Sequence, residues 1–127
     1  MQELTKAEER IMRILWEMER GFVKDIIEHF PDPKPPYNTI STIIRILDQK
    51  GFVGHKSYGN SYQYYPLISK EEYTHKFMKK FVKNYFENSF GNLVHFFSKQ
   101  SDLDVEEVDK VIQMLEEVKN QKQQNNG

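Results

Sequence analysis

The chain has 127 residues and no cysteine. This absence excludes disulfides, thiolate nucleophiles and cysteine-ligated metals, and it is compatible with the cytoplasm. The sequence also lacks a run of about 18 apolar residues, so we expect no transmembrane helix. Its first residues, MQELTKAEER, are polar and acidic, unlike a signal peptide. These features together predict a cytoplasmic protein.

Motifs for catalysis and cofactor binding are missing as well. The chain shows no Ser/His/Asp set, no Gly-rich phosphate loop and no paired-carboxylate signature. Its histidines are scattered, and no pair has the i, i+4 spacing of a helical zinc site: they are His29, His55, His75 and His95. We therefore expect neither an enzyme nor a metal- or cofactor-binding protein.

The net charge of −1 conceals an uneven distribution. Residues 34–66 carry four cations against Asp48 alone, namely Lys34, Arg45, Lys50 and Lys56. Residues 102–117 carry seven carboxylates against Lys110 alone. Positive charge concentrated in one segment favours a nucleic-acid partner for that segment. The alternative is that both segments are ordinary solvated faces.

Apolar spacing predicts two helices before residue 31. Residues 5–18 form the first, because their apolar residues recur at helical spacing and TKAE at the start has the spacing of a capping box. We expect Gly21 to end this helix and residues 22–23 to form a short strand. Residues 24–30 form the second helix. The following segment PDPKPP, residues 31–36, cannot be helical and predicts a turn.

The most informative stretch is residues 37–66. Residues 37–50 predict a helix closed by Gly51, with an apolar side made by Ile40, Ile43, Ile44 and Leu47. Its other side carries short hydrogen-bonding groups and one guanidinium, from Asn38, Ser41, Thr42 and Arg45. Such groups read base edges and hold phosphates. The alternative is a core helix whose outer face is merely solvated.

A hairpin follows this helix. Residues 53–56 and 61–65 alternate as strands, and Gly59-Asn60 supplies the turn. A polar-faced helix followed by a basic hairpin is typical of a winged helix-turn-helix, so we expect residues 1–67 to be a DNA-binding domain. The helix N-terminus enters the major groove in this motif, and its dipole favours phosphate. The candidate DNA-binding residues are Tyr37, Asn38, Thr39, Ser41, Thr42, Arg45, Lys56, Tyr58, Asn60 and Ser61.

Residues 68–127 predict a helical dimerisation domain. Residues 69–88 form a helix with a wide apolar band, broken by Gly91, and residues 93–97 and 104–119 predict two more before a frayed polar tail. A segment this small rarely supplies its own core, so we expect two copies to interlock. The alternative is that these helices fold back on the first domain. The candidate interface residues are Phe77, Phe81, Leu93, Phe97, Ile112 and Leu115.

Several segments, in order and at matching spacing, resemble the penicillinase-repressor family of bacterial winged-helix regulators, the BlaI, MecI and CopY type. They include LTKAEERIMRILW, NTISTIIRIL, KGFVGHK, QYYPL, FGNLVHFFSKQSDLD and VDKVIQMLEE. The resemblance implies a homodimer that represses transcription from an inverted-repeat operator. It also implies release of DNA by cleavage of the dimerisation domain, signalled by a membrane sensor metalloprotease.

The chain departs from the family pattern at two places. Ser41 stands where related repressors often have arginine, which leaves the operator sequence open. The aligned cleavage site is Phe96-Phe97 rather than Asn-Phe, so cleavage there is a hypothesis only. The copper-responsive branch uses a cysteine cluster that this chain lacks.

The sequence therefore predicts a mainly α fold with a small β-hairpin wing: a winged helix-turn-helix followed by a C-terminal helical dimerisation domain. We expect a dimeric repressor that binds an inverted-repeat operator in double-stranded DNA. The alternative is a winged-helix module that binds protein and has no sequence-specific DNA binding.

Overall fold

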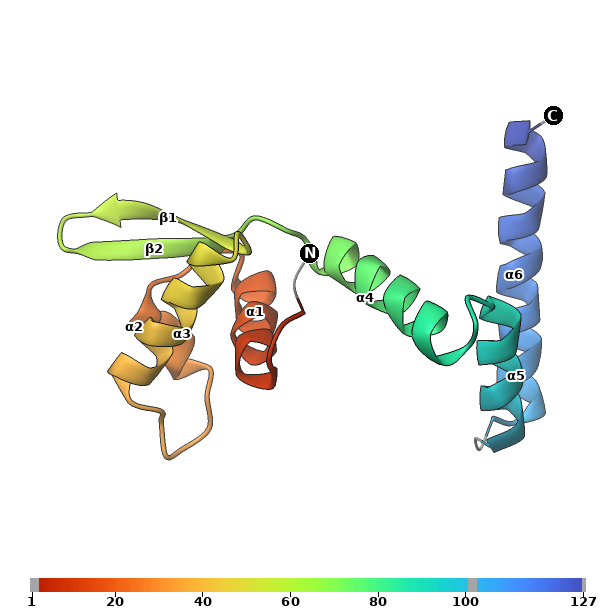
Figure 1. Cartoon of the computed structure of the whole chain (residues 1–127), viewed down its shortest axis with the longest axis horizontal. Helices are drawn as coiled ribbons and strands as arrows, with labels where there is room; N and C mark the ends of the chain where they lie inside the picture. Colours follow the sequence, from red (N-terminus) through yellow and green to blue (C-terminus); the bar gives the residue numbers. More distant parts are fainter. Residues whose placement is uncertain (1–2, 101–102, 127) are drawn as a thin grey trace. The chain divides into compact units, whose positions relative to one another are not determined.

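The computed structural model describes residues 3–100 and 103–126 and divides the chain into two compact units, residues 1–80 and 81–127 (Figure 1). The first unit contains α1 (Lys6–Met18), α2 (Val23–Glu28), α3 (Tyr37–Gln49), β1 (Val53–Tyr58), β2 (Ser61–Pro66) and most of α4 (Lys70–Tyr85). The second contains the end of α4, α5 (Phe90–Gln100) and α6 (Val105–Asn126). This order confirms a mainly helical fold with an N-terminal winged helix-turn-helix. The boundary at residue 67 stays a prediction.

The capping box predicted at the start of α1 is present. The Thr5 N–H donates to Oε1 of Glu8 over 2.8 Å, and the Glu8 N–H donates to Oγ1 of Thr5 over 3.1 Å. Ile11 and Leu15, one turn apart, are fully buried. The helix ends at Met18, as predicted, but the residue with a positive φ that follows it is Glu19, at 74°, rather than Gly21.

Gly21 does not end α1 as predicted but pairs with the wing through its backbone. Its N–H donates to the Tyr64 carbonyl over 2.9 Å, and the Tyr64 N–H donates to the Gly21 carbonyl over 2.8 Å. A Cβ at position 21 would lie 2.5 Å from Cε of Met18, so a larger residue would displace the end of the Met18 side chain. The expected strand at residues 22–23 is wrong, because Phe22 precedes α2 and its N–H donates to Oδ2 of Asp25 over 3.0 Å.

The helix predicted at residues 37–50 is confirmed as α3. It fully buries Ile44 and Leu47 against α1 and α2, and Ile40 is nearly buried. Gly51, with a φ of +84°, follows the last turn, where a left-handed residue ends a helix most easily. One face of α3 is thereby fixed in the core, and the opposite face is available to a partner.

The strands β1 and β2 pair in antiparallel register to form the wing, with His55 opposite Tyr64. Each strand is longer than predicted. Gly59, with a φ of +61°, occupies the first position of the two-residue turn, as hairpin turns require. The phenol ring of Tyr65 covers Gly54, since a Cβ there would lie 2.8 Å from a ring carbon.

The second unit differs from expectation in three places. The chain leaves α4 at Tyr85 because Glu87 and Asn88 have positive φ angles of 52° and 60°, while Gly91 lies inside α5 and does not break a helix. The predicted helix of residues 93–97 extends to Phe90–Gln100. The polar tail is helical as far as Asn126 rather than frayed.

One ion pair joins the beginning of α1 to the end of α3. Nζ of Lys50 donates to Oε1 of Glu8 over 2.8 Å, and Glu8 is only 3% exposed. Burial raises the pKa of Glu8, but the hydrogen bonds from Lys50 and Thr5 and the charge of Lys50 outweigh it, so the pKa lies below its ordinary value. The Glu8 carboxylate therefore stabilises the folded state at neutral pH.

We predict that Glu8→Gln destabilises the chain by about 1–2 kcal/mol at neutral pH, because charge-assisted hydrogen bonds contribute on this scale. A carboxylate with a lowered folded pKa stabilises above its unfolded pKa, and that contribution is lost as pH falls through the folded pKa. The difference between wild type and variant in urea unfolding should therefore shrink on acidification. Glu9→Gln is the control, since Glu9 pairs with Arg13 on the surface. Equal losses for the two variants would contradict the assignment.

Candidate nucleic-acid interface

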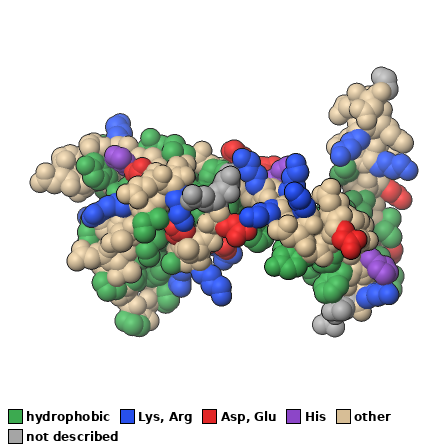
Figure 2. All heavy atoms as spheres, viewed as in Figure 1, with side chains coloured by type: hydrophobic (Ala, Val, Ile, Leu, Met, Phe, Trp, Pro, Cys, Tyr) green, Lys and Arg blue, Asp and Glu red, His purple; other side chains and the backbone are tan. Residues whose placement is uncertain are grey.

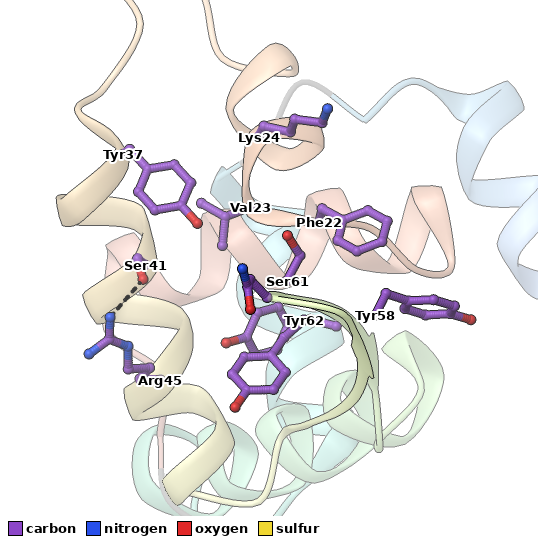
Figure 3. Close-up of a pocket in the computed structure, with 11 residues that line it drawn as sticks. Phe22, Val23, Lys24, Tyr37, Ser41, Arg45, Tyr58, Ser61 and Tyr62 are labelled. Atoms are coloured by element: carbon purple, nitrogen blue, oxygen red, sulfur yellow. Dashed lines mark hydrogen bonds between the residues drawn. The ribbon is translucent and has the colours of Figure 1, made fainter.

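A groove of about 570 Å³ lies between α3, the beginning of α2 and the wing (Figure 3). One wall is a row of α3 side chains one turn apart, Tyr37, Ser41 and Arg45. The remaining lining residues come from α2 with its preceding residue and from the wing: Phe22, Val23, Lys24, Tyr58, Asn60, Ser61, Tyr62 and Tyr64. Six of the predicted candidates therefore line one groove: Tyr37, Ser41 and Arg45 of α3 and Tyr58, Asn60 and Ser61 of the wing. Asn38, Thr39, Thr42 and Lys56 are not among its lining residues.

Ser41 does not lie on the outer face as predicted. It is only 7% exposed, and its Oγ accepts a hydrogen bond from Nη2 of Arg45 over 3.2 Å (Figure 3). The Arg45 side chain itself is exposed. The serine hydroxyl therefore helps to hold the Arg45 guanidinium in place. Direct contact of Ser41 with DNA stays a prediction.

The outer face of α3 is exposed at its N-terminal end. Tyr37, Asn38, Thr39 and Thr42 are all exposed. Oγ1 of Thr42 donates to the Asn38 carbonyl over 2.8 Å, which uses its proton and leaves its lone pairs as acceptors. Pro36 precedes the helix, and no side chain caps this terminus. The positive end of the helix dipole is therefore presented together with short polar side chains.

The exposed wing residues include all four candidates, Lys56, Tyr58, Asn60 and Ser61. Nζ of Lys56 lies 5.3 Å from the centroid of the Tyr58 ring, and that ring meets Phe22 edge-on at 5.8 Å. The ammonium group is thus held beside the wing tip, where it can meet an anion.

A second contact fixes the wing against α3. Nδ1 of His55 lies 2.5 Å from Oδ2 of Asp48, and the imidazole packs against Tyr62 with a centroid separation of 4.7 Å. Burial, and then the negative charge of Asp48, raise the pKa of Tyr64 beneath the imidazole. The wing is therefore held by the backbone pairing of Tyr64 with Gly21 and by the contact of His55 with Asp48 of α3.

The cations of residues 34–66 do not all serve the same surface. Arg45 and Lys56 are exposed, but Lys50 is paired with Glu8. Nζ of Lys34 donates to the carbonyls at the end of α2, 3.0 Å to Glu28 and 2.5 Å to Phe30. Sequence reasoning missed Lys24, which is exposed and lines the groove. Its place at the beginning of the first helix of a helix-turn-helix was the signal available.

The predicted interface residues of the C-terminal region are mostly exposed. Phe77, Phe97, Ile112 and Leu115 are exposed and Phe81 is half-buried, whereas Leu93 is only 7% exposed and packs within its own chain. Figure 2 shows hydrophobic side chains on the surface of the second unit. The candidate cleavage residues Phe96 and Phe97 lie inside α5. None of these roles is tested by the geometry of one chain.

Other chemistry finds little support in the part of the chain that the structure describes. No three His, Asp or Glu side chains within residues 3–100 and 103–126 gather so as to hold a metal ion. Over the same ranges, no helix is long and apolar enough to cross a membrane. The exposed face of α3, flanked by a wing that carries a cation, defines the class: a winged helix-turn-helix protein with a surface suited to DNA.

Comparison with known proteins identifies the family. The model of the penicillinase repressor family matches residues 4–117, and the chain belongs to this family. The regulatory protein of methicillin resistance MecI from Staphylococcus aureus is 29% identical over 114 residues, covering 89% of this chain and 93% of the relative. The penicillinase repressor of Bacillus licheniformis is 25% identical over 127 residues and covers 96% of each chain.

A solved structure of the DNA-binding domain of the repressor BlaI aligns with a TM-score of 0.49 and 24% identity, over 56% of this chain and 88% of that one. The family match, which spans both units, carries the functional assignment instead. The chain is a DNA-binding transcriptional repressor of the BlaI and MecI type and not an enzyme.

Proposed function

We propose that this repressor binds an inverted-repeat operator as a homodimer, with α3 of each protomer in the major groove. The observation that carries the proposal is the exposed N-terminal end of α3, where Asn38, Thr39 and Thr42 surround an uncapped helix terminus. Short polar side chains at that position reach base edges, and the helix dipole favours nearby phosphate. As a DNA-binding repressor, the chain acts where the DNA is, in the cytoplasm.

The candidate residues of α3 and the wing divide into two kinds of contact. Asn38 and Thr42 carry donors and acceptors suited to base edges. Arg45 and Lys56 carry charges suited to phosphate, with Ser41 holding the guanidinium of Arg45 in place. Tyr37, Tyr58, Asn60 and Ser61 line the groove and add hydrogen-bonding groups along the path of the backbone. Phosphate contacts set affinity and orientation, and base contacts set the sequence.

The support for a dimer is the apolar surface of the C-terminal helices. None of the described residues of α6 is buried, and Val105, Ile112 and Leu115 are exposed. A single chain that leaves such residues in water forgoes about 25 cal/mol for each Å² of apolar area. A second copy that covers them recovers this free energy, with Phe77, Phe81, Phe97, Ile112 and Leu115 as the proposed anchors. Leu93, the sixth predicted anchor, is already buried within its own chain.

Cleavage within the dimerisation region would release the DNA. The proposed bond, Phe96–Phe97, lies inside α5. A protease that binds its substrate as an extended strand therefore requires this turn of the helix to unfold first. A membrane sensor metalloprotease system would supply the signal, as the family resemblance implies.

We predict that DNA selected from a random library by the full chain contains an inverted repeat. The two half-sites should lie about one helical turn apart, or a multiple of it, because two α3 helices related by a two-fold axis meet the same face of the duplex. Selection followed by footprinting measures both features. A single asymmetric half-site, bound with full affinity by a monomer, would contradict the proposal.

Two groups of variants should separate the contact types. Arg45→Ala and Lys56→Ala should weaken binding to selected and random duplexes alike and flatten the salt dependence. Asn38→Ala and Thr42→Ala should instead change the preference among sequences, at about 1–3 kcal/mol for each interaction with a base edge that is removed. Binding titrations at several salt concentrations measure both effects. Lys70→Ala, an exposed cation of α4, is the control. Equal losses on both duplexes for all four variants would refute the assignment.

Truncation after Phe96 tests the release mechanism. Removing the rest of α5 and all of α6 should leave a monomer that binds the operator weakly. In a dimer, binding of one winged-helix domain raises the effective concentration of the other at its half-site, and a monomer loses this gain. Sedimentation measures the mass, and titration with the selected duplex measures affinity. A truncated chain that stays dimeric and binds as tightly as the full chain would exclude this mechanism.

A further inference from the structure

A second groove, of about 390 Å³, lies on the side of α3 away from the wing. Its walls come from the beginning of α1, from α3 and from the segment between α2 and α3: Lys6, Ala7, Arg10, Ile11, Phe30, Pro35, Thr39, Ile40 and Ile43. We call Lys6, Arg10 and Thr39 the α1 flank. No part of the function described so far uses Lys6 or Arg10.

The cations of the α1 flank are exposed and available. Both Lys6 and Arg10 are exposed, and within residues 3–100 and 103–126 neither has a carboxylate partner at ion-pair distance. The carboxylates near them in sequence are already engaged: Glu3 pairs with Lys80, Glu8 with Lys50 and Glu9 with Arg13. Among the residues that the structure describes, these two positive charges therefore have no counter-charge at ion-pair distance.

One of these cations is also held in place. The guanidinium carbon of Arg10 lies 4.6 Å from the centroid of the Phe30 ring, a cation–π distance. A guanidinium that rests on an aromatic ring keeps its edge N–H groups free to donate. Holding the side chain in advance lowers the conformational entropy lost when an anion binds.

The position of the α1 flank suggests its partner. Ser41 and Arg45 line the groove beside the wing, whereas Thr39 and Ile43 line the groove beside α1. A helix in the major groove lies between two sugar-phosphate backbones. On the wing side, Arg45 and Lys56 meet one backbone under the proposed function. The α1 flank then lies on the side of α3 that faces the other backbone.

We propose that Lys6 and Arg10 bind the phosphodiester backbone on the side of α3 opposite the wing. This inference rests on the proposed function, because it assumes that α3 occupies the major groove. The two contacts add sequence-independent affinity and hold α3 between two anionic strands. Thr39, exposed in the first turn of α3 next to Lys6 and Arg10, contributes a hydroxyl to the same backbone.

The test compares two variants of the full chain that remove the same number of charges from the same part of the fold. Lys6→Gln/Arg10→Gln removes the α1 flank cations, and Arg13→Gln/Arg20→Gln removes two other exposed cations in and just after α1. The probes are the selected operator duplex and a random-sequence duplex of equal length, titrated by fluorescence anisotropy between about 50 and 200 mM salt. Urea unfolding of each variant checks that the fold is retained.

The flank variant should lose affinity for both duplexes by a similar factor. Its plot of log affinity against log salt should become shallower by about one for each phosphate that is no longer neutralised. The control variant should match the wild type, and Lys6→Arg/Arg10→Lys, which keeps both charges, should retain the wild-type salt dependence. If the flank and control variants behave alike while Arg45→Ala loses binding, the flank contact is overturned and the proposed function stands. A wild-type chain without salt-dependent binding overturns both.

Discussion

The backbone pairing between Gly21 and Tyr64 is the constraint on which the DNA-binding surface depends. It ties β2 to the chain just before α2, and the absence of a side chain at position 21 leaves room for the end of the Met18 side chain. Phe22, at the start of one wall of the groove, and Tyr64, at its base, are therefore set by the same two hydrogen bonds. The contact of His55 with Asp48 then fixes the wing against the last turn of α3. Without the backbone pairing, β2 would have no main-chain hydrogen bonds to the segment that precedes α2.

Local patterns predicted the elements of this surface better than the contacts between them. The apolar spacing of α3 and the left-handed Gly51 are local signals, and both are confirmed. The burial of Ser41 is not local, since it arises where the wing and α2 close over one side of α3. The same holds for Lys50: its charge is visible in the sequence, but its pairing with Glu8 joins residues 42 positions apart. Counting cations along the segment therefore overstated the charge available to DNA.

For the C-terminal helices, the sequence predicted that helices form but not where they begin and end. Their spacing predicted helices, but both are longer than the apolar pattern required: α6 continues through a polar segment that contains no breaker, and α5 begins before Gly91 and includes it. The actual break after α4 comes at Glu87 and Asn88, where positive φ angles replace the glycine that the pattern favoured. Leu93 is buried by its own chain, whereas Val105 is 77% exposed. Under the proposed dimer, a second copy of the chain covers these exposed apolar residues, so one chain alone does not display their contacts.

The two faces of α3, one buried in the core and one exposed, have an evolutionary consequence. Ile44 and Leu47 are buried in the hydrophobic core, whereas the side chains of Asn38 and Thr42 are exposed and do not pack in that core. Substitutions at the outward positions can therefore accumulate without loss of the core. Under the proposed function, a lineage can in this way acquire a new operator while keeping the same scaffold. Ser41 is the exception, because it is both packed and bonded to Arg45. A larger side chain there would have to displace the guanidinium or the wing, so position 41 should diverge only together with its neighbours.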